Sequence, residues 1–198
     1  MVKRTALPLL LVALIICLLT GCSAAQQPLA TNQPGASENR IVIVYLSRTN
    51  NTKAVAEMIR EEVGGTLVPI ELENPYPQNY QLTVQQVARD NETGYLPPLR
   101  TKIGDFGKYD VVFLGFPTWG MQLPPPMKSF LRQHDLNGKT IVPFNTNAGY
   151  GEGSSFRTVR ELCSGCKVLE GFAIRGGVER DGRFLVIKAK ERMKSRRK

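Results

Sequence analysis

The chain has 198 residues, of which 42% are hydrophobic, and it contains 18 Gly and 13 Pro. This composition excludes a disordered protein, a collagen and a multi-pass membrane protein, and the length predicts one folded domain of ordinary size. Lys and Arg outnumber Asp and Glu by 26 to 17, which gives a net charge of +9. Such a charge can indicate a nucleic-acid or membrane partner, so its position along the chain has to be found first.

The first 21 residues predict a bacterial lipoprotein signal peptide. Lys3 and Arg4 precede an uncharged, Leu-rich stretch from Ala6 to Leu19, which is shorter than the ~20 residues that span a bilayer. Leu19-Thr20-Gly21-Cys22 then resembles the lipobox, in which the cysteine becomes the lipid-modified first residue of the mature chain. We therefore expect Cys22 to anchor a protein that works outside the cytoplasm on a membrane. An uncleaved anchor that happens to end in cysteine is the alternative.

The residues after the signal divide into a tether, a domain and a tail. Residues 22–38, rich in Ala, Gln, Pro, Asn and Ser, predict a polar tether, and the folded domain is expected over residues 39–178. The chain from Cys22 to Ile174 holds 14 basic and 14 acidic residues, whereas the chain from Arg175 onward holds 10 and 3. The excess charge therefore belongs to a basic tail, residues 179–198. Beside a lipid anchor it would attract anionic lipid, and the alternative is a solvated helix without a partner. Nucleic acid is not an expected partner, because no aromatic residue for base stacking follows Phe184.

Apolar runs alternate with helical patterns along the domain. The first run, Ile41 to Leu46, is continuous and β-branched, as in a parallel strand that is covered on both faces. Further strands are predicted at 66–72, 111–116, 140–145 and 167–174. Helices are predicted at 52–63, around 80–90, around 127–131, up to 162, and at 183–192. Five strands with helices between them predict a doubly wound α/β fold built on a parallel sheet.

Ligands of such sheets bind beyond the carboxyl ends of the strands, so the loops that follow strands one, three and four are the candidate site. The first loop offers hydroxyls, side-chain amides and free backbone N–H groups at a helix start, which suits a phosphate dianion. The glycine-rich motifs of nucleoside triphosphatases and dinucleotide-binding folds are missing, which favours a single phosphate monoester. The residues of this loop are Ser47, Arg48, Thr49, Asn50, Asn51 and Thr52.

The two other loops suit a flat ring. The loop after the third strand holds the chain's only Trp, whose face can stack on a ring with a free energy of roughly 1 to 3 kcal/mol. The glycines of the loop after the fourth strand allow its backbone to approach a ligand closely. Taken singly, the three loops also fit a helix cap, a Trp at the edge of the core and an ordinary turn. The residues concerned are Pro117, Thr118, Trp119 and Gly120, and then Asn145, Thr146, Asn147, Gly149, Tyr150 and Gly151.

In this order the three loops resemble those of the flavodoxin family. The resemblance covers about Arg40 to Ile174 and is greatest to a flavodoxin-like branch found in bacterial lipoproteins and small flavoproteins, in which Pro75-Tyr76 and Tyr80 have similar counterparts. It implies a five-stranded sheet in the order 2-1-3-4-5 and one non-covalently bound FMN. It also implies that residues 47–52 hold the FMN phosphate and that the flavin ring lies between the other two loops.

Two features depart from the flavodoxin pattern. Asn50 stands where many flavodoxins have Gly, which Asn tolerates because it adopts left-handed backbone conformations. The domain is also neutral, whereas electron-carrying flavodoxins are typically acidic. Nearby charge tunes the potential of a flavin, so we expect a less negative low-potential couple here.

The remaining reactive residues predict no catalytic group. Cys163 and Cys166 follow an apolar helical stretch that ends at Leu162, and a helix C-terminus disfavours a thiolate. We therefore expect a structural disulfide or two unreactive thiols rather than a redox pair. His134 lies seven residues after Met127 on the same helical face and is expected at the edge of the core. No catalytic triad, metal-ligand cluster or pair of carboxylates stands out.

These features predict an extracytoplasmic, lipid-anchored FMN protein that transfers electrons, as a carrier or as a reductase of a small acceptor such as a quinone. A lipoprotein that binds another phosphorylated or planar ligand without redox turnover is the main alternative. A signalling receiver domain is disfavoured because Ser47 and Pro117, rather than acidic residues, follow the first and third strands.

Overall fold

The structure is a computed structural model that describes residues 40–175. The predicted signal peptide, Cys22, the tether, the basic tail and the helix predicted at 183–192 lie outside the described residues. No helix among residues 40–175 combines the length and the apolar character that a membrane crossing requires.

One parallel sheet organises the described part of the chain. Its strands pair in the order β2-β1-β3-β4-β5, with β6 also paired to β4, and every pairing is parallel. The predicted doubly wound order 2-1-3-4-5 is therefore confirmed. The strands are β1 (Ile41–Tyr45), β2 (Thr66–Pro69), β3 (Val111–Pro117), β4 (Thr140–Asn147), β5 (Lys167–Val168) and β6 (Phe172–Arg175).

Two predicted strands differ from the observed ones by more than two residues. The fifth strand, predicted as one run, is divided into β5 and β6 around Glu170 and Gly171. The interruption lies beside Pro143, which has no backbone N–H and stands between the residues of β4 that pair with β5 and those that pair with β6. The second strand ends at Pro69 instead of Leu72, because Leu72 turns to form an isolated antiparallel bridge with Leu99.

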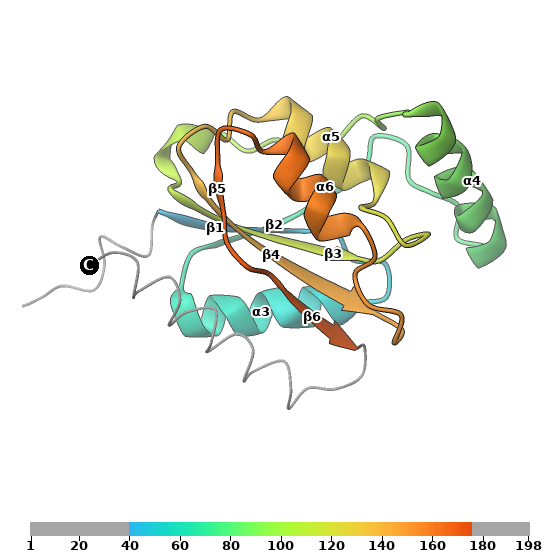
Figure 1. The fold of residues 1–198 in the computed structure, drawn as a ribbon, viewed down its shortest axis with the longest axis horizontal. Helices are drawn as coiled ribbons and strands as arrows, with labels where there is room; N and C mark the ends of the chain where they lie inside the picture. The colour runs from blue at the N-terminus through green and yellow to red at the C-terminus, as the bar shows by residue number, and fades with distance from the viewer. Residues whose placement is uncertain (1–39, 176–198) are drawn as a thin grey trace, which may run out of the picture. The chain divides into compact units, whose positions relative to one another are not determined.

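Helices cover both faces of the sheet (Figure 1). One helix, α3, lies on one face, and α5 and α6 lie on the other, while α4 stands beyond the edge at the right of the view. The helices are α3 (Asn51–Val63), α4 (Tyr80–Thr93), α5 (Pro125–Gln133) and α6 (Ser155–Leu162), with a single 3₁₀ turn, η1 (Phe106–Lys108), before β3.

The alternation of side chains along the strands divides the core into two clusters. Val42 and Val44 pack with Met127 and Phe130 of α5, whereas Ile43 packs on the opposite face with residues of α3. Both clusters are buried, which explains why the strands are continuously apolar. Burial of each large aliphatic or aromatic side chain stabilises the fold by about 1.5–3 kcal/mol.

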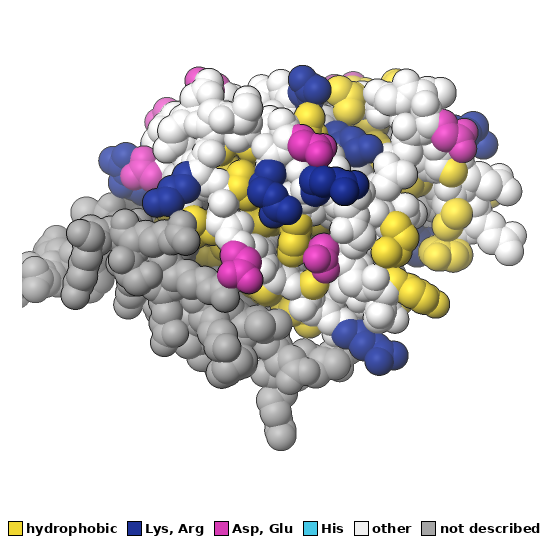
Figure 2. Space-filling view, in the orientation of Figure 1, with side chains coloured by type: hydrophobic (Ala, Val, Ile, Leu, Met, Phe, Trp, Pro, Cys, Tyr) yellow, Lys and Arg dark blue, Asp and Glu magenta, His cyan; other side chains and the backbone are white. Residues whose placement is uncertain are grey.

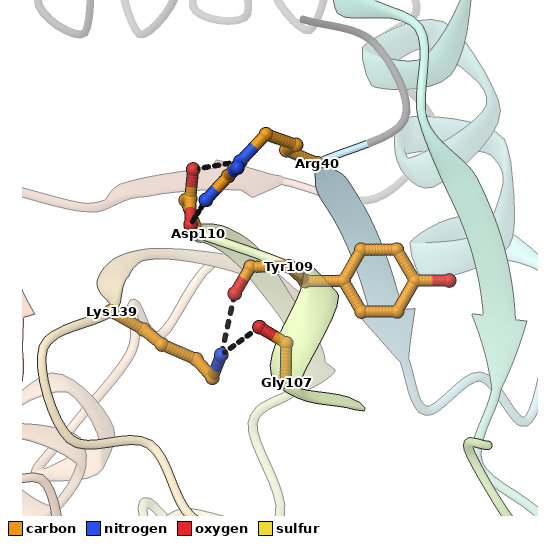
Figure 3. A network of polar contacts seen from close by, with 5 residues as sticks. All are labelled: Arg40, Gly107, Tyr109, Asp110 and Lys139. Carbon is orange, nitrogen blue, oxygen red and sulfur yellow. Dashed lines mark hydrogen bonds and ion pairs between the residues drawn. The ribbon is translucent and has the colours of Figure 1, made fainter. Parts of the chain in front are cut away.

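A polar network holds the amino ends of the central strands (Figure 3). Arg40, directly before β1, forms a two-point ion pair with Asp110, directly before β3. The buried Lys139, directly before β4, donates to the backbone carbonyls of Tyr109 and Gly107. These charged side chains therefore lie at the edge of the sheet opposite to the candidate site.

Candidate functional site

The structure brings the three predicted loops together at the carboxyl edge of the sheet. The Oγ1 atoms of Thr52 and Thr146 are 2.8 Å apart in a buried hydrogen bond, which joins the first loop to the third. Thr118 joins the second loop to the third, because its backbone N–H donates to the carbonyl of Thr146 at 3.0 Å and its hydroxyl donates to the carbonyl of Gly151 at 2.7 Å.

The first loop presents its polar groups at the N-terminus of α3. Asn50 adopts the left-handed conformation, with φ 64°, as expected from its side chain. Arg48, Thr49, Asn50 and Asn51 are exposed, and the first turn of α3 contains no acidic residue. The positive end of the helix dipole and the exposed donors favour an anion at this position.

Some predicted site residues use their side chains to position the loops. Thr52 and Thr146 are buried, and each hydroxyl bonds to the other. Asn145 is fully buried, and its Nδ2 donates to the carbonyl of Phe116 at 3.1 Å and to the hydroxyl of Thr118 at 2.9 Å. These three side chains fix the distance between the loops rather than project from them.

The loop after β4 is folded by Asn147. Its Oδ1 accepts from the backbone N–H of Gly149 at 2.8 Å and from that of Gly151 at 3.2 Å. This arrangement leaves Tyr150 at the tip of the loop with 80% of its surface exposed. A neighbouring bond, from the N–H of Ser154 to the carbonyl of Met121 at 2.9 Å, holds this loop against the one that follows β3.

The loop after β3 orients Trp119. Backbone bonds between Trp119 and Gln122 close a tight turn. The half-buried indole makes a T-shaped contact with Tyr76, with 5.6 Å between the ring centroids. The hydroxyl of Tyr76 donates to Oδ2 of the buried Asp90, on α4, at 2.7 Å. Burial, followed by this hydrogen bond, raises the pKa of Tyr76, so the phenol stays protonated and keeps donating.

A cavity of about 330 Å³ lies between α4 and the first two loops. Arg48, Thr118, Trp119 and Gly120 of the predicted site line it, together with residues of α4. Figure 2 shows hydrophobic side chains gathered at the right, on the side where α4 and the carboxyl ends of the strands lie.

The α4 wall and the Asp90–Tyr76 pair were not among the residues assigned to the site from the sequence. The four-residue spacing of Tyr80, Val84 and Ala88 is a signal that could have indicated one helical face. Nothing in the sequence indicated that Asp90 would be buried against Tyr76.

The other reactive residues lie away from the three loops. Cys163 and Cys166 are free thiols, and burial raises the pKa of Cys163 to about 12 and raises that of Cys166. They are therefore poor nucleophiles at neutral pH, and the disulfide considered above is not formed. Nδ1 of His134 lies 3.1 Å from the carbonyl of Phe130, and its ring packs on Phe106 and Phe130, which confirms its place at the edge of the core. Within residues 40–175, no three His, Cys, Asp or Glu side chains are grouped as metal ligands.

The strand order reverses between β1 and β3, and the candidate site lies at this point of the sheet. Fold and site together define a doubly wound α/β protein in which a helix start that favours an anion lies beside a cavity. A family model described as Flavodoxin matches residues 40–185, and the chain belongs to the flavodoxin family.

Individual relatives agree with this assignment. The chain is 24% identical over 122 residues to a flavodoxin from Synechocystis sp., and the match covers 60% of this chain but only 58% of that relative. A structure from Bacteroides eggerthii, described as that of a flavoprotein, is 31% identical, has a TM-score of 0.63 and covers 68% of this chain and 87% of its own. A flavoprotein from Lactobacillus acidophilus in complex with FMN is 24% identical, has a TM-score of 0.62 and covers 72% and 97% of the two chains.

Proposed function

We propose that this protein is an FMN-binding electron-transfer flavoprotein, which works as a carrier or as a reductase of a small acceptor. The observation that carries the proposal is the convergence of the three loops at one sheet edge, joined by the Thr52–Thr146 and Thr118–Gly151 bonds. Membership of the flavodoxin family and the FMN complex of a structural relative support the choice of FMN.

The residues of the site suit the two ends of FMN. The exposed loop from Arg48 to Asn51 would hold the phosphate, because it offers hydroxyl, side-chain amide and backbone N–H donors at a helix N-terminus. Trp119 would lie against the ring system, and the loop from Asn147 to Gly151 would border its other side. When bound, FMN supplies one- and two-electron redox chemistry, whose potential the protein tunes by stacking and nearby charge.

The proposed place of action is a membrane surface outside the cytoplasm. The signal-like residues 1–21 and the lipobox that ends in Cys22 support a lipid anchor. The basic tail would add electrostatic attraction to anionic lipid. The balanced charge of the domain supports a less negative low-potential couple than an acidic flavodoxin has.

A visible absorption spectrum of the native, membrane-extracted protein, recorded before and after dithionite, tests the proposal. A yellow protein that bleaches on reduction and releases FMN on denaturation supports it. A colourless protein that FMN cannot reconstitute contradicts it and favours the alternative, a lipoprotein that binds another phosphorylated or planar ligand.

Two variants test the positions of the phosphate and the ring. Trp119→Ala and Thr49→Ala should each weaken FMN binding, roughly tenfold for Trp119, because the loss of one stack corresponds to about 1–3 kcal/mol. Thr93→Ala is the matched control, since its hydroxyl bonds to the carbonyl of Arg89 within α4. Unchanged FMN affinity in both site variants would place the pocket elsewhere.

The anchor is tested separately. Cys22→Ser should move the protein from the membrane fraction to the soluble fraction and abolish the incorporation of labelled fatty acid. If Cys22→Ser stays on the membrane and still incorporates the label, the lipid anchor is not at Cys22.

A further inference from the structure

The cavity beside α4 extends beyond the residues assigned to FMN. Four of its lining residues belong to the predicted flavin site, but its opposite wall is α4. This helix contributes the apolar Tyr80, Val84, Val87 and Ala88 and the polar Thr83, Asn91 and Glu92. The proposed phosphate and ring positions need none of these α4 residues. The cavity therefore has one wall, on α4, to which the proposed cofactor positions give no role.

The part of the α4 wall formed by Tyr80 and Val84 is apolar and open. Tyr80 is 67% exposed and Val84 48% exposed, although both lie on a helix whose buried positions are Thr83, Val87 and Asp90. Trp119 forms the facing wall, and its indole contacts Tyr76 in a T-shaped arrangement. A flat, apolar molecule between these walls would cover surface that is otherwise in contact with water.

The guanidinium of Arg48 lies at one end of the cavity, in a fixed position. A terminal nitrogen of Arg48 donates to the carbonyl of Gln78 at 2.9 Å, and the guanidinium lies 5.6 Å from the centre of the Tyr80 ring. These two contacts hold the side chain at the rim, while guanidinium has five N–H groups in a fixed plane. Its other donors can bond to an oxygen at the edge of a ring that lies against Tyr80.

We propose that this cavity binds a quinone of one or two fused rings, the small electron acceptor of the protein. The ring lies between Trp119 and the Tyr80–Val84 face of α4, and a quinone oxygen accepts from Arg48. The volume of about 330 Å³ is at the lower end of the range of about 300–1,000 Å³ that holds drug-sized ligands, which fits one or two rings rather than a larger ligand. The carboxylate of Glu92 also lines the cavity, which disfavours an anionic acceptor. This assignment rests on the proposed redox function, because it identifies the acceptor of that function.

The experiment is equilibrium dialysis of 2-methyl-1,4-naphthoquinone against the FMN-loaded, full-length protein. Val84→Arg places a long charged side chain in the cavity and should weaken quinone binding at least tenfold. Leu82→Arg is the matched control, because Leu82 is 51% exposed on the same helix and does not line the cavity. It should change the affinity less than twofold, and both variants should keep the FMN affinity of the unmodified protein.

A second variant guards against misfolding of Val84→Arg. Tyr80→Ala removes the exposed aromatic wall without adding charge and should weaken the quinone about fivefold at unchanged FMN affinity. Absence of quinone binding to the unmodified protein, or equal binding to all variants, would overturn the proposal. Loss of FMN together with the quinone in Val84→Arg would show that the flavin itself occupies the cavity.

Failure of the proposed function would be recognised separately. If the protein does not bind FMN, the same dialysis on the FMN-free chain still compares Val84→Arg with Leu82→Arg. Selective loss of quinone in Val84→Arg would then retain the cavity as a quinone site in a protein without flavin. Equal quinone binding by the two variants would contradict the quinone site as well as the proposed redox function.

Discussion

The helices α3 and α4 both border the candidate site, but they are attached to the molecule in different ways. Helix α3 lies along the sheet and contacts β1, β2, β3 and β4, and its own residues Val55, Ala56 and Ile59 are buried against the sheet. Helix α4 stands beyond the sheet and packs on α5, and its large apolar residues Tyr80 and Val84 are exposed.

This difference separates the two ends of the site. The turn at the start of α3, which is the proposed phosphate site, belongs to the same packed unit as the core, so it forms when the domain folds. The α4 wall is held by the buried Thr83 and Val87 and by polar contacts. These include Tyr76 with Asp90, and Lys128 Nζ with Asn91 Oδ1 at 2.8 Å. The comparison teaches that the proposed phosphate end is fixed by the core, whereas exposed residues of the α4 wall can change with little effect on folding.

The largest expected effect comes from the α3 side. Ile59→Ala should lower the free energy of unfolding by about 2–5 kcal/mol. The Ile59 side chain is fully buried, so its removal leaves a cavity between α3 and the sheet. Urea denaturation followed by circular dichroism measures this loss. A loss below 1 kcal/mol would mean that α3 is not part of the packed unit, and the comparison would fail.

The next effect tests the attachment of α4. Tyr76→Phe removes the donor to the buried Asp90. This should lower the free energy of opening of α4 by about 1.5–3 kcal/mol, because the acceptor is a carboxylate. Native-state hydrogen exchange should show faster exchange in α4 and little change in α3. If both helices lose protection equally, α4 is not a separate unit.

Alkaline pH should weaken the attachment of α4, in the same direction as Tyr76→Phe. The pKa of Tyr76 is raised in the folded protein by burial and by Asp90, so the unfolded state ionises first. The stability that this group contributes is complete below the ordinary tyrosine pKa of about 10 and is lost as the pH rises above it. Exchange or limited proteolysis of α4 should increase above that pH in the unmodified protein. The Tyr76→Phe protein should lack the part of the increase that Tyr76 causes.

A smaller effect is expected where the loops are joined on the α3 side. Thr52→Val removes the hydrogen bond to Thr146 at nearly constant shape, which should cost about 1 kcal/mol. It should also weaken FMN binding, because the first and third loops are no longer held together. Thr52→Ser keeps a hydroxyl and should restore most of both quantities. If Val and Ser behave alike, the bond does not set the distance between the loops.

The smallest effect is expected for a substitution on the exposed face of α4. Val84→Ala should change the free energy of unfolding by less than about 0.5 kcal/mol, since the side chain is exposed. Thermal unfolding of this variant beside Ile59→Ala gives the contrast between the two helices in one experiment. A large loss in Val84→Ala would show that the open wall is part of the core.

Much of this fold could be predicted from local sequence patterns. The continuous apolar run at Ile41 predicts β1 because a strand covered on both faces leaves no polar position. The end of α3 at Gly64, with φ 71°, was likewise readable from the sequence. The division of the fifth strand was not, because it depends on the neighbouring Pro143 in β4, which is distant in the sequence.

The candidate site shows the same limit. The order of the loops predicted that Ser47, Trp119 and Asn147 would come to one sheet edge, because carboxyl ends of parallel strands share an edge. The bond between Thr52 and Thr146 joins residues 94 positions apart, and no local pattern announces it. The α4 wall was missed because helical spacing shows which residues share a face but not whether that face is covered.

The Arg40–Asp110 clamp fixes where the preceding chain joins the domain. Arg40 stands at the amino end of β1, and the loop that begins at Ser47 follows its carboxyl end, so the length of one strand separates the point of attachment from the ligand opening. Whatever is fused or immobilised ahead of Arg40 is thus connected at the opposite rim. An electrode or bead coupled through that end leaves the mouth facing bulk solution, accessible to diffusing molecules.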